Sequence, residues 1–361
     1  MGLTPTTWAG KRVLVTGHTG FKGAWLCQWL CDMGAVVTGV SLAPEDSNNL
    51  WDQLALGQVA SHIADIRDAQ AMDQIVQGAR PQVIFHLAAQ SLVRRSYATP
   101  VETFDTNVMG TVNVLNAARS CDDLQAVVVV TTDKCYQNDE DARAFLETDP
   151  MGGHDPYSAS KGAAEIATAA MRASFFGPGG AGRNGALVAS GRAGNVIGGG
   201  DWSQDRIVPD ILRGCLSGSG EVVIRSPNAV RPWQHVLEPL AGYLLLAQSL
   251  MDGQQSAASG WNFGPNPDQE RPVIELVNKL IAELGQGRAV IDEAAANLHE
   301  AQILRLDSSK ARNIGWQPAL GFDETAAWTA SWYRDFNGGV SASELCRAQI
   351  AAYHKIMEAM Q

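Results

Sequence analysis

The chain has 361 residues, of which 45% are hydrophobic and 18% charged, and its formal net charge is −11. That length is enough for one large or two modest domains, and the acidic balance argues against nucleic acid as a partner. No apolar run is long enough to cross a bilayer, the N-terminus lacks the layout of a secretion signal, and the cysteines lack zinc-site spacing. We expect a cytoplasmic protein with no membrane contact and no metal.

The first half of the chain alternates predicted strands and helices. Strands are predicted over residues 11–17, 35–42, 81–89, 125–132 and 185–196, and helices over residues 23–33, 101–120 and 156–175. This alternation predicts an α/β fold with a doubly wound parallel sheet and right-handed crossovers.

Near residue 196 the alternation ends and glycine- and proline-rich stretches begin, such as GGGDW (198–202). We expect residues 1–196 to form a dinucleotide-binding domain, with 233–262 returning to it. Residues 197–361 are expected to form a smaller, irregular substrate-binding domain.

The segment TGHTGFKG (16–23) sets three glycines in GxxGxxG spacing between the first strand and a helix. Such glycines permit a tight turn and let backbone amides approach a pyrophosphate at the helix N-terminus. Plain turns also contain such glycines, but the position between strand and helix favours a nucleotide site. We expect the imidazole of His18 to approach the phosphates. The predicted cofactor residues of this loop are Gly17, His18, Gly20, Phe21, Lys22 and Gly23.

The adenosine side of the site favours NAD over NADP. Ser41 stands where an acid at the end of the second strand would bind the ribose, and no arginine follows to take a 2′-phosphate. Asp65 and Ile66 follow the third strand and are candidates for the adenine edge, although Asp65 is also compatible with a solvated loop position.

Two polar groups of residues carry the predicted chemistry. Tyr157 and Lys161 are four apart on a helix and share one face, where a nearby ammonium lowers a phenol pKa toward working pH. Thr132, Asp133 and Lys134 end the apolar strand at 125–132, at the sheet edge where ligands bind in open α/β folds. The alternatives are an exposed tyrosine beside a solvated lysine, and a surface salt bridge.

These motifs resemble a known family. The glycine loop, FHLAAQ (85–90), NVMGTVN (107–113) and YxxxK together resemble the extended short-chain dehydrogenases/reductases, which implies a Rossmann sheet. TTDKCY (131–136) and RPWQHVLEPLAGYL (231–244) resemble the nucleotide-sugar 4,6-dehydratases within it, in particular those that act on CDP-glucose. The resemblance covers about residues 10–320.

The resemblance implies three proton transfers on a hexose. Tyr157 would take the C4 hydroxyl proton while hydride leaves for NAD⁺, Lys134 would take the C5 proton, and Asp133 would protonate the leaving C6 hydroxyl, with Thr132 beside them. Asp133 must then be protonated, which burial favours. Lys134 must be neutral, which burial or the neighbouring Lys161 would favour.

Further site residues follow from the same resemblance. The strand end Leu87, Ala88 and Ala89 would join Tyr157 and Lys161 at the cofactor. The substrate would meet Gln90, Arg192, Asn195, Arg206 and Arg231, and guanidinium groups suit a diphosphate in an acidic chain. A homodimer is also implied, with helices 101–120 and 156–175 forming a four-helix bundle with their mates.

Three alternatives remain open from the sequence. A nucleotide-sugar 4-epimerase would share the cofactor, Tyr157 and Lys161, but would not need Asp133 and Lys134. A redox-sensing regulator would keep the dinucleotide fold without needing any of these groups. A simple reductase would release its coenzyme at each turnover.

Overall fold

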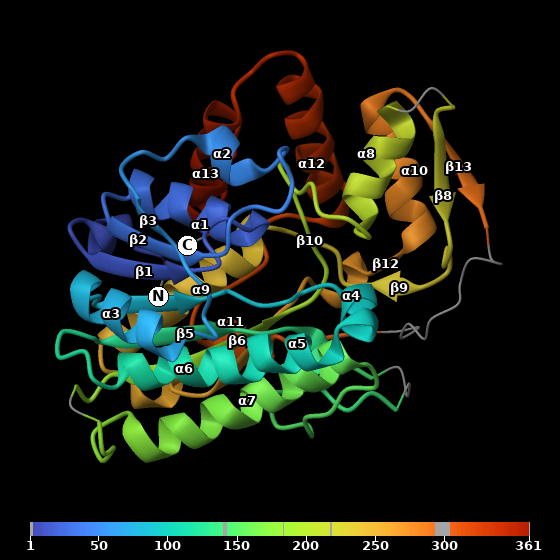
Figure 1. Cartoon of the computed structure of the whole chain (residues 1–361). Coiled ribbons are helices and arrows are strands. Elements are labelled where there is room, and N and C mark those ends of the chain that lie inside the picture. The colour runs from blue at the N-terminus through green and yellow to red at the C-terminus, as the bar shows by residue number, and fades with distance from the viewer. Residues whose placement is uncertain (1–2, 140–142, 183, 217–218, 293–303, 361) are drawn as a thin grey trace.

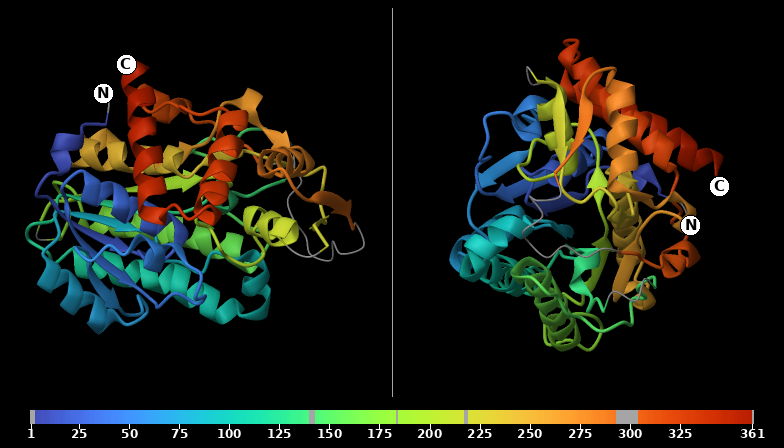
Figure 2. Two further views of the ribbon diagram at one scale, coloured as in Figure 1. Left: turned by 90° about the horizontal axis from the view of Figure 1, so that it is seen from above. Right: turned by 90° about the vertical axis from the view of Figure 1, so that its right-hand side faces the viewer.

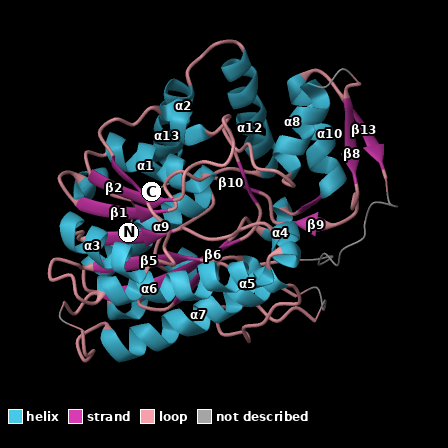
Figure 3. Ribbon diagram, viewed as in Figure 1, coloured by secondary structure: helices cyan, strands magenta, loops and turns pink. Residues whose placement is uncertain are grey.

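The computed structural model describes residues 3–139, 143–182, 184–216, 219–292 and 304–360. A seven-stranded sheet in the order β11-β6-β5-β4-β1-β2-β3 forms the centre of the molecule, and every neighbouring pair is parallel (Figures 1 and 3). Its strands are β1 Arg12–Thr16, β2 Val36–Ser41, β3 Ala60–Ile63, β4 Val83–His86, β5 Ala126–Val130, β6 Leu187–Ala193 and β11 Gly260–Phe263. The predicted doubly wound parallel sheet is confirmed.

Helices cover both faces of this sheet (Figure 1). One layer contains α3 Ala69–Ala79, α6 Gly110–Ala118 and α7 Pro156–Phe175, and the other contains α1 Phe21–Asp32 and α9 Leu237–Met251. Alternate residues of β5 point to opposite faces, so Val127 and Val129 join the core under α3 and α6, while Val128 and Val130 join the core under α1 and α9. A strand buried on both faces explains the unbroken run of valines.

The predicted helix at 101–120 is interrupted in the structure. An α-helical segment, α5 Pro100–Phe104, passes through a π-helical turn, Asp105–Met109, into α6. The turn carries Asn107, whose amide is hydrogen bonded to the backbone N and O of Gln90. Interruptions of this kind often occur at functional sites. The apolar pattern across 101–120 gave no signal of it.

Smaller elements complete the chain. The remaining helices are α2 Leu50–Leu54, α4 Val93–Ala98, α8 Ile207–Leu216, α10 Val273–Leu284, α11 Ser309–Asn313, α12 Phe322–Asn337 and α13 Ala342–Ala359. Short 3-10 turns span Pro5–Trp8, Asp133–Cys135, Gln255–Ala257 and Pro267–Gln269. Two-stranded sheets pair β7 Val196–Ile197 with β10 Gln234–His235, β9 Val230–Arg231 with β12 Arg271–Pro272, and β8 Glu221–Ile224 with β13 Arg288–Ile291.

Late segments of the chain return to the first half. α9 packs on β5 and β6, and β11 pairs with β6 at the edge of the main sheet. α13 packs against α1, where Arg347 forms an ion pair with Asp32 (Figure 2). The division into domains 1–196 and 197–361 stays a prediction. In the described part of the chain, no helix is both long and apolar enough to span a membrane.

Candidate active site

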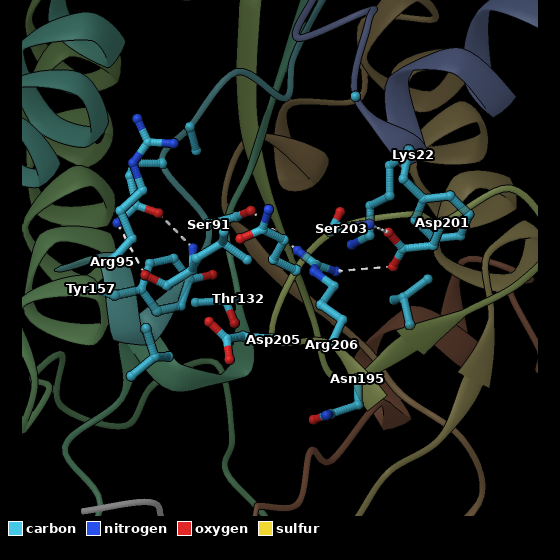
Figure 4. Close-up of a pocket in the computed structure, with 18 of the residues that line it drawn as sticks. Lys22, Ser91, Arg95, Thr132, Tyr157, Asn195, Asp201, Ser203, Asp205 and Arg206 are labelled. Carbon is cyan, nitrogen blue, oxygen red and sulfur yellow. Dashed lines mark hydrogen bonds and ion pairs between the residues drawn. The ribbon is translucent and has the colours of Figure 1, made fainter. Parts of the chain in front are cut away.

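A cavity of about 1080 Å³ lies at the carboxyl ends of the parallel strands, between the sheet and the α8–β8 region. All the predicted site residues except His18 and Arg192 line it (Figure 4). These are Gly17, Gly20, Phe21, Lys22, Gly23, Asp65, Ile66, Leu87, Ala88, Ala89, Gln90, Thr132, Asp133, Lys134, Tyr157, Lys161, Asn195, Arg206 and Arg231. The fold therefore gathers residues from most of the chain around one chamber.

The glycine loop brings the backbone close to the cavity. Gly17 has a positive φ of 75°, and a Cβ there would lie 2.7 Å from the backbone N of Ala88. A Cβ at Gly23 would lie 2.1 Å from the carbonyl oxygen of Gly17, so neither position accepts a side chain. Gly20 is the N-cap of α1 and places no side chain over the first amides. The helix N-terminus is therefore open to an anion.

The structure places the side chain of His18 away from the phosphates' expected position. Its ring is fully buried, packs edge-on against Trp51 and makes a 2.7 Å hydrogen bond from Nε2 to Ser61 Oγ. A Cβ at Gly39 would fall 2.4 Å from the same ring, so the imidazole fills the space that a glycine in β2 leaves. Burial lowers the pKa of His18 to about 4. These contacts do not favour the predicted approach of this imidazole to the phosphates, which stays a prediction.

The adenosine end of the cavity contains the predicted polar groups. Ser41 ends β2, and its hydroxyl shares a 2.8 Å hydrogen bond with Thr19. The carboxylate of Asp65 accepts 2.9 Å hydrogen bonds from the backbone N and Nε of Arg67, and these hold the pKa of Asp65 below its usual value. Ile66 packs beside Gly110 of α6, where a Cβ would lie 2.4 Å from Ile66 Cδ1. A contact of Asp65 with adenine stays a prediction.

The polar cluster at the end of β5 is largely buried. Thr132 is the N-cap of the 3-10 turn Asp133–Cys135, and its hydroxyl donates a 3.0 Å hydrogen bond to Asp133 Oδ1. Asp133 Oδ2 has no hydrogen-bond partner among the described residues. Burial raises the pKa of Asp133, although Lys134, Thr132, Arg231 and Lys22 act to lower it. A buried carboxyl with a raised pKa and an unused oxygen is suited to act as a general acid.

Tyr157 and Lys161 face the same cavity from α7. A hydrogen bond with Thr132 and the charge of Arg206 act to lower the pKa of Tyr157, but burial outweighs them and raises it to about 12. Burial lowers the pKa of Lys161 to about 8, and its Nζ donates a 3.2 Å hydrogen bond to the carbonyl oxygen of Val130. The expectation that Lys161 lowers the phenol pKa is therefore wrong for this structure, because burial dominates.

Arg192 does not contact the cavity. Its Nε and Nη2 bind both carboxylate oxygens of Glu165 at 3.0 and 2.9 Å, and the two side chains are only 6% and 5% exposed. Its Nη1 donates to Tyr136 Oη at 2.6 Å. The predicted role of Arg192 in substrate binding is wrong, because every guanidinium nitrogen is engaged inside the protein.

Arg206, Arg231 and Asn195 line the substrate end of the cavity. Arg206 donates a 3.1 Å hydrogen bond to Ser91 Oγ and lies 3.8 Å from Asp201, so its guanidinium bridges two walls (Figure 4). Arg231 is 2% exposed and donates to the carbonyl oxygen of Val230. Two guanidinium groups in one chamber of an acidic protein provide a local site for a diphosphate.

Sequence reasoning missed Asp201, which lines the cavity, and Asn107, which supports the loop of Gln90 behind it. Asp201 is buried and lies in the GGGDW segment, which was noted only as a glycine-rich stretch. Asn107 fixes the backbone of Gln90, and NVMGTVN was its only signal. Gln90 lines the cavity, but its side-chain amide bonds to Thr103 and Leu92, so it shapes this loop. A direct contact of Gln90 with substrate stays a prediction.

Comparison with known proteins identifies the family. The sequence model described as GDP-mannose 4,6 dehydratase matches residues 14–329, which include the glycine loop, the cluster at the end of β5 and the helix of Tyr157. The chain belongs to this dehydratase family. The predicted relationship to nucleotide-sugar 4,6-dehydratases is confirmed.

Members of the family with curated names span nearly the whole chain. The CDP-glucose 4,6-dehydratase of Salmonella typhimurium is 44% identical over 348 residues, which are 96% of this chain and 97% of the relative. A dTDP-glucose 4,6-dehydratase of Xanthomonas campestris is 27% identical over 345 residues, covering 89% of this chain and 92% of the relative.

Solved structures show the same fold. The dTDP-glucose 4,6-dehydratase of Bacillus anthracis, in complex with NAD, has a TM-score of 0.74 at 21% identity and covers 91% of this chain and 98% of its own. MoeE5, in complex with UDP-glucose and NAD, has a TM-score of 0.75 at 25% identity and covers 91% and 100%. Their resemblance confirms the fold class of the family for this chain.

Proposed function

We propose that the protein is an NAD-dependent CDP-glucose 4,6-dehydratase, which converts CDP-glucose to CDP-4-keto-6-deoxyglucose with loss of water. The observation that carries the proposal is the cluster at the end of β5, where a buried Asp133 with an unused oxygen lies between Thr132 and Lys134 in the cavity that Tyr157 also lines. An oxidation alone needs only Tyr157 and Lys161. The added acid and amine suit an elimination.

The residues present fit NAD. The open N-terminus of α1 offers backbone amides to a pyrophosphate, and Gly17 and Gly23 permit that close approach. Asp65 and Ile66 would contact the adenosine, and Tyr157 with Lys161 would contact the nicotinamide half. The chemistry that bound NAD⁺ supplies is acceptance of hydride from C4 and its return to C6 of the same sugar.

The chain's own residues move the protons. Tyr157 takes the C4 hydroxyl proton as its phenolate, a form that burial opposes and the charge of Arg206 favours. The 4-keto group acidifies C5, whose proton goes to the amine of Lys134. Asp133, kept protonated by burial, gives its proton to the C6 hydroxyl, which leaves as water. Lys134 then returns its proton to C5 as hydride reaches C6, and the proton that Tyr157 took from O4 replaces the one that Asp133 gave up.

CDP-glucose is proposed from the 44% identical Salmonella relative, whose printed name gives that substrate. Arg206, Arg231 and Asn195 would take the diphosphate and sugar, because they line the cavity beside Asp133. The test incubates the protein with NAD⁺ and, separately, CDP-, dTDP-, UDP- and GDP-glucose. We expect the 4-keto-6-deoxy product to form faster from CDP-glucose than from the other three nucleotide sugars. Formation of a 4-epimer without loss of water would instead support the epimerase alternative.

We also propose that the protein acts as a homodimer through α5 and α7. Val101 is 82% exposed, Ile166 61% and Met109 48%, and all three lie on helices of one face. A hollow beside Val101 and Phe104 also contacts Ala163 of α7. Exposed apolar side chains gathered in this way are typical of an interface, and small residues permit close packing of helices.

A further inference from the structure

Helix α7 meets the end of β5 through residues spaced one turn apart. Tyr157 lines the cavity together with Thr132, and Lys161 Nζ donates a hydrogen bond to the carbonyl oxygen of Val130. Residues four apart share one face of a helix, so the next side chain on this face is Glu165. It is buried and does not line the cavity.

Glu165 continues the same line of contacts. Its Oε1 accepts a 2.5 Å hydrogen bond from Thr131 Oγ1, on the residue between Val130 and Thr132. Its Oε2 accepts a 2.7 Å bond from Ser190 Oγ of β6. Three successive turns of α7 therefore contact three successive residues of the strand end that carries the proposed acid.

Arg192 holds this carboxylate in place. Its fork binds both oxygens of Glu165, and its remaining Nη1 donates to Tyr136 Oη and to the carbonyl oxygen of Glu147. Tyr136 in turn donates a 2.6 Å hydrogen bond to Asn262 of β11. The pair thus links α7 to three strands of the sheet, and it explains why an arginine predicted at the substrate is found inside the protein.

We infer that the buried Glu165–Arg192 pair positions groups for the reaction. It fixes α7 relative to the end of β5, so that Thr132 and Asp133 lie level with Tyr157 and Lys161 in the cavity. The inference rests on the proposed function. A slide of α7 or a rotation of the strand end by a fraction of a turn would separate Tyr157 from Thr132. A fixed carboxylate gripped from both oxygens resists such a movement, because a bidentate guanidinium pair restricts angle as well as distance.

The charge of Glu165 also acts on Lys161 along the helix. Burial lowers the pKa of Lys161, and the carboxylate of Glu165 partly opposes that by raising it. Burial on its own raises the pKa of Glu165, but hydrogen bonds from Arg192, Thr131 and Ser190 outweigh it and hold that pKa below its usual value. The hydrogen bonds thus favour the ionised carboxylate of Glu165, one turn from Lys161.

The decisive experiment compares two hydroxyls that donate to the same carboxylate. Thr131→Val removes the bond at the strand end, and Ser190→Ala removes the matched bond from β6. We expect kcat with CDP-glucose to fall about ten- to a hundredfold in Thr131→Val, with KM unchanged, because misplacement of reacting groups by about 1 Å has effects of this size. Ser190→Ala is expected to stay within about twofold of wild type.

Conservative variants separate positioning from loss of stability. Thr131→Ser keeps the hydroxyl and is expected to restore kcat. Arg192→Lys keeps the positive charge but cannot bind both oxygens of Glu165. We would test this variant instead if Thr131→Val unfolds at the assay temperature. Equal losses of kcat in Thr131→Val and Ser190→Ala, at equal melting temperatures, would show a purely structural role. An unchanged kcat in Thr131→Val, or a rise confined to KM, would also overturn the inference.

A second readout does not depend on turnover. We expect NAD⁺ affinity to fall as pH rises and Lys161 loses its proton. In Glu165→Gln this fall in affinity should occur about one pH unit lower, because the removed carboxylate no longer raises the pKa of Lys161. Titration of bound NAD⁺ against pH measures it, and coincident profiles for wild type and variant would contradict the inference. A wild-type protein that neither binds NAD⁺ nor forms keto sugar would refute the proposed function itself.

Discussion

Two buried tyrosine hydroxyls near the cavity offer a matched comparison at the scale of single residues. Tyr157 lines the cavity, whereas Tyr243 does not line it, and Tyr243 Oη has no hydrogen-bond partner among the described residues. We expect Tyr157→Phe to lower kcat on the order of a hundred- to ten-thousandfold, the range for a lost general base. Tyr243→Phe is expected to keep wild-type turnover. Stopped-flow NADH absorbance and melting temperature measure both, and a Tyr157→Phe variant with normal hydride transfer would exclude this residue as the base.

The acid and the amine at the end of β5 are distinguished by isotope exchange at C5. Lys134→Ala is expected to oxidise C4 but to stall before elimination, with NADH absorbance and no exchange of the C5 hydrogen with D₂O. Asp133→Asn is expected to continue exchange while loss of water slows. Normal exchange in Lys134→Ala would place the C5 base elsewhere.

The pH dependence of elimination follows from Asp133. An acid works only while protonated, and burial raises the pKa of this carboxyl, so activity should persist above the usual pKa of aspartate and fall as pH rises through the raised value. Rates of water loss from pre-formed 4-keto sugar, measured against pH, check this fall in activity. In the control variant Asp133→Asn, the fall with rising pH is expected to disappear.

Single residues also show where sequence reasoning ended. The types and spacing of Tyr157, Lys161 and Asp133 were enough to place them, because strand ends and helix faces fix their direction. The roles of His18 and Arg192 were not predictable, because each depends on a distant partner. His18 fits a space left by Gly39, and Arg192 fits Glu165.

At the scale of elements, the proposed dimer depends on α5 and α7. Val101→Glu would place a charge in an interface, where it must lose water without a partner. We expect the variant to be monomeric by light scattering at micromolar concentration, and wild type to be dimeric. Val36→Glu is the control, because Val36 is 58% exposed but lies on β2. A dimeric Val101→Glu would move the interface to another face.

Regular elements were predicted more accurately than their interruptions. The helix at 156–175 matches α7 to within a residue, because apolar and small residues repeat along one face. The π-helical turn Asp105–Met109 was missed. It contains Asn107, which hydrogen bonds to the backbone of Gln90. Periodicity records the face that a helix buries and contains no information about such a local contact.

At the scale of the whole molecule, Glu238 joins segments from the last third of the chain. It begins α9, accepts hydrogen bonds from the backbone N of Ala319 and Leu320, and accepts another at 2.8 Å from Tyr353 of α13. Burial raises the pKa of Glu238 to about 7 from an ordinary value of 4.5. The folded state therefore favours the protonated carboxyl.

The contribution of Glu238 to the stability of the fold should consequently decrease with rising pH. A folded-state pKa above the unfolded value gives stabilisation that is complete below pH 4.5 and lost as pH rises through about 7. The contribution is on the order of 3 kcal/mol. Urea unfolding between pH 5 and 8 measures it against wild type, and Glu238→Gln should remove this component of the pH dependence. Glu275→Gln, at a half-exposed carboxylate, should not; identical profiles for Glu238→Gln and wild type would refute this linkage.

The packing of α13 on α1 has a consequence for synthesis on the ribosome. The indole of Trp29, in the helix that follows the glycine loop, donates to His354 and lies edge-on against Tyr353. That partner emerges more than 300 residues later, and β11 likewise reaches β6 late. Domains generally fold as they are translated, N-terminal first. Here α1 must wait, partly uncovered, until α13 has emerged.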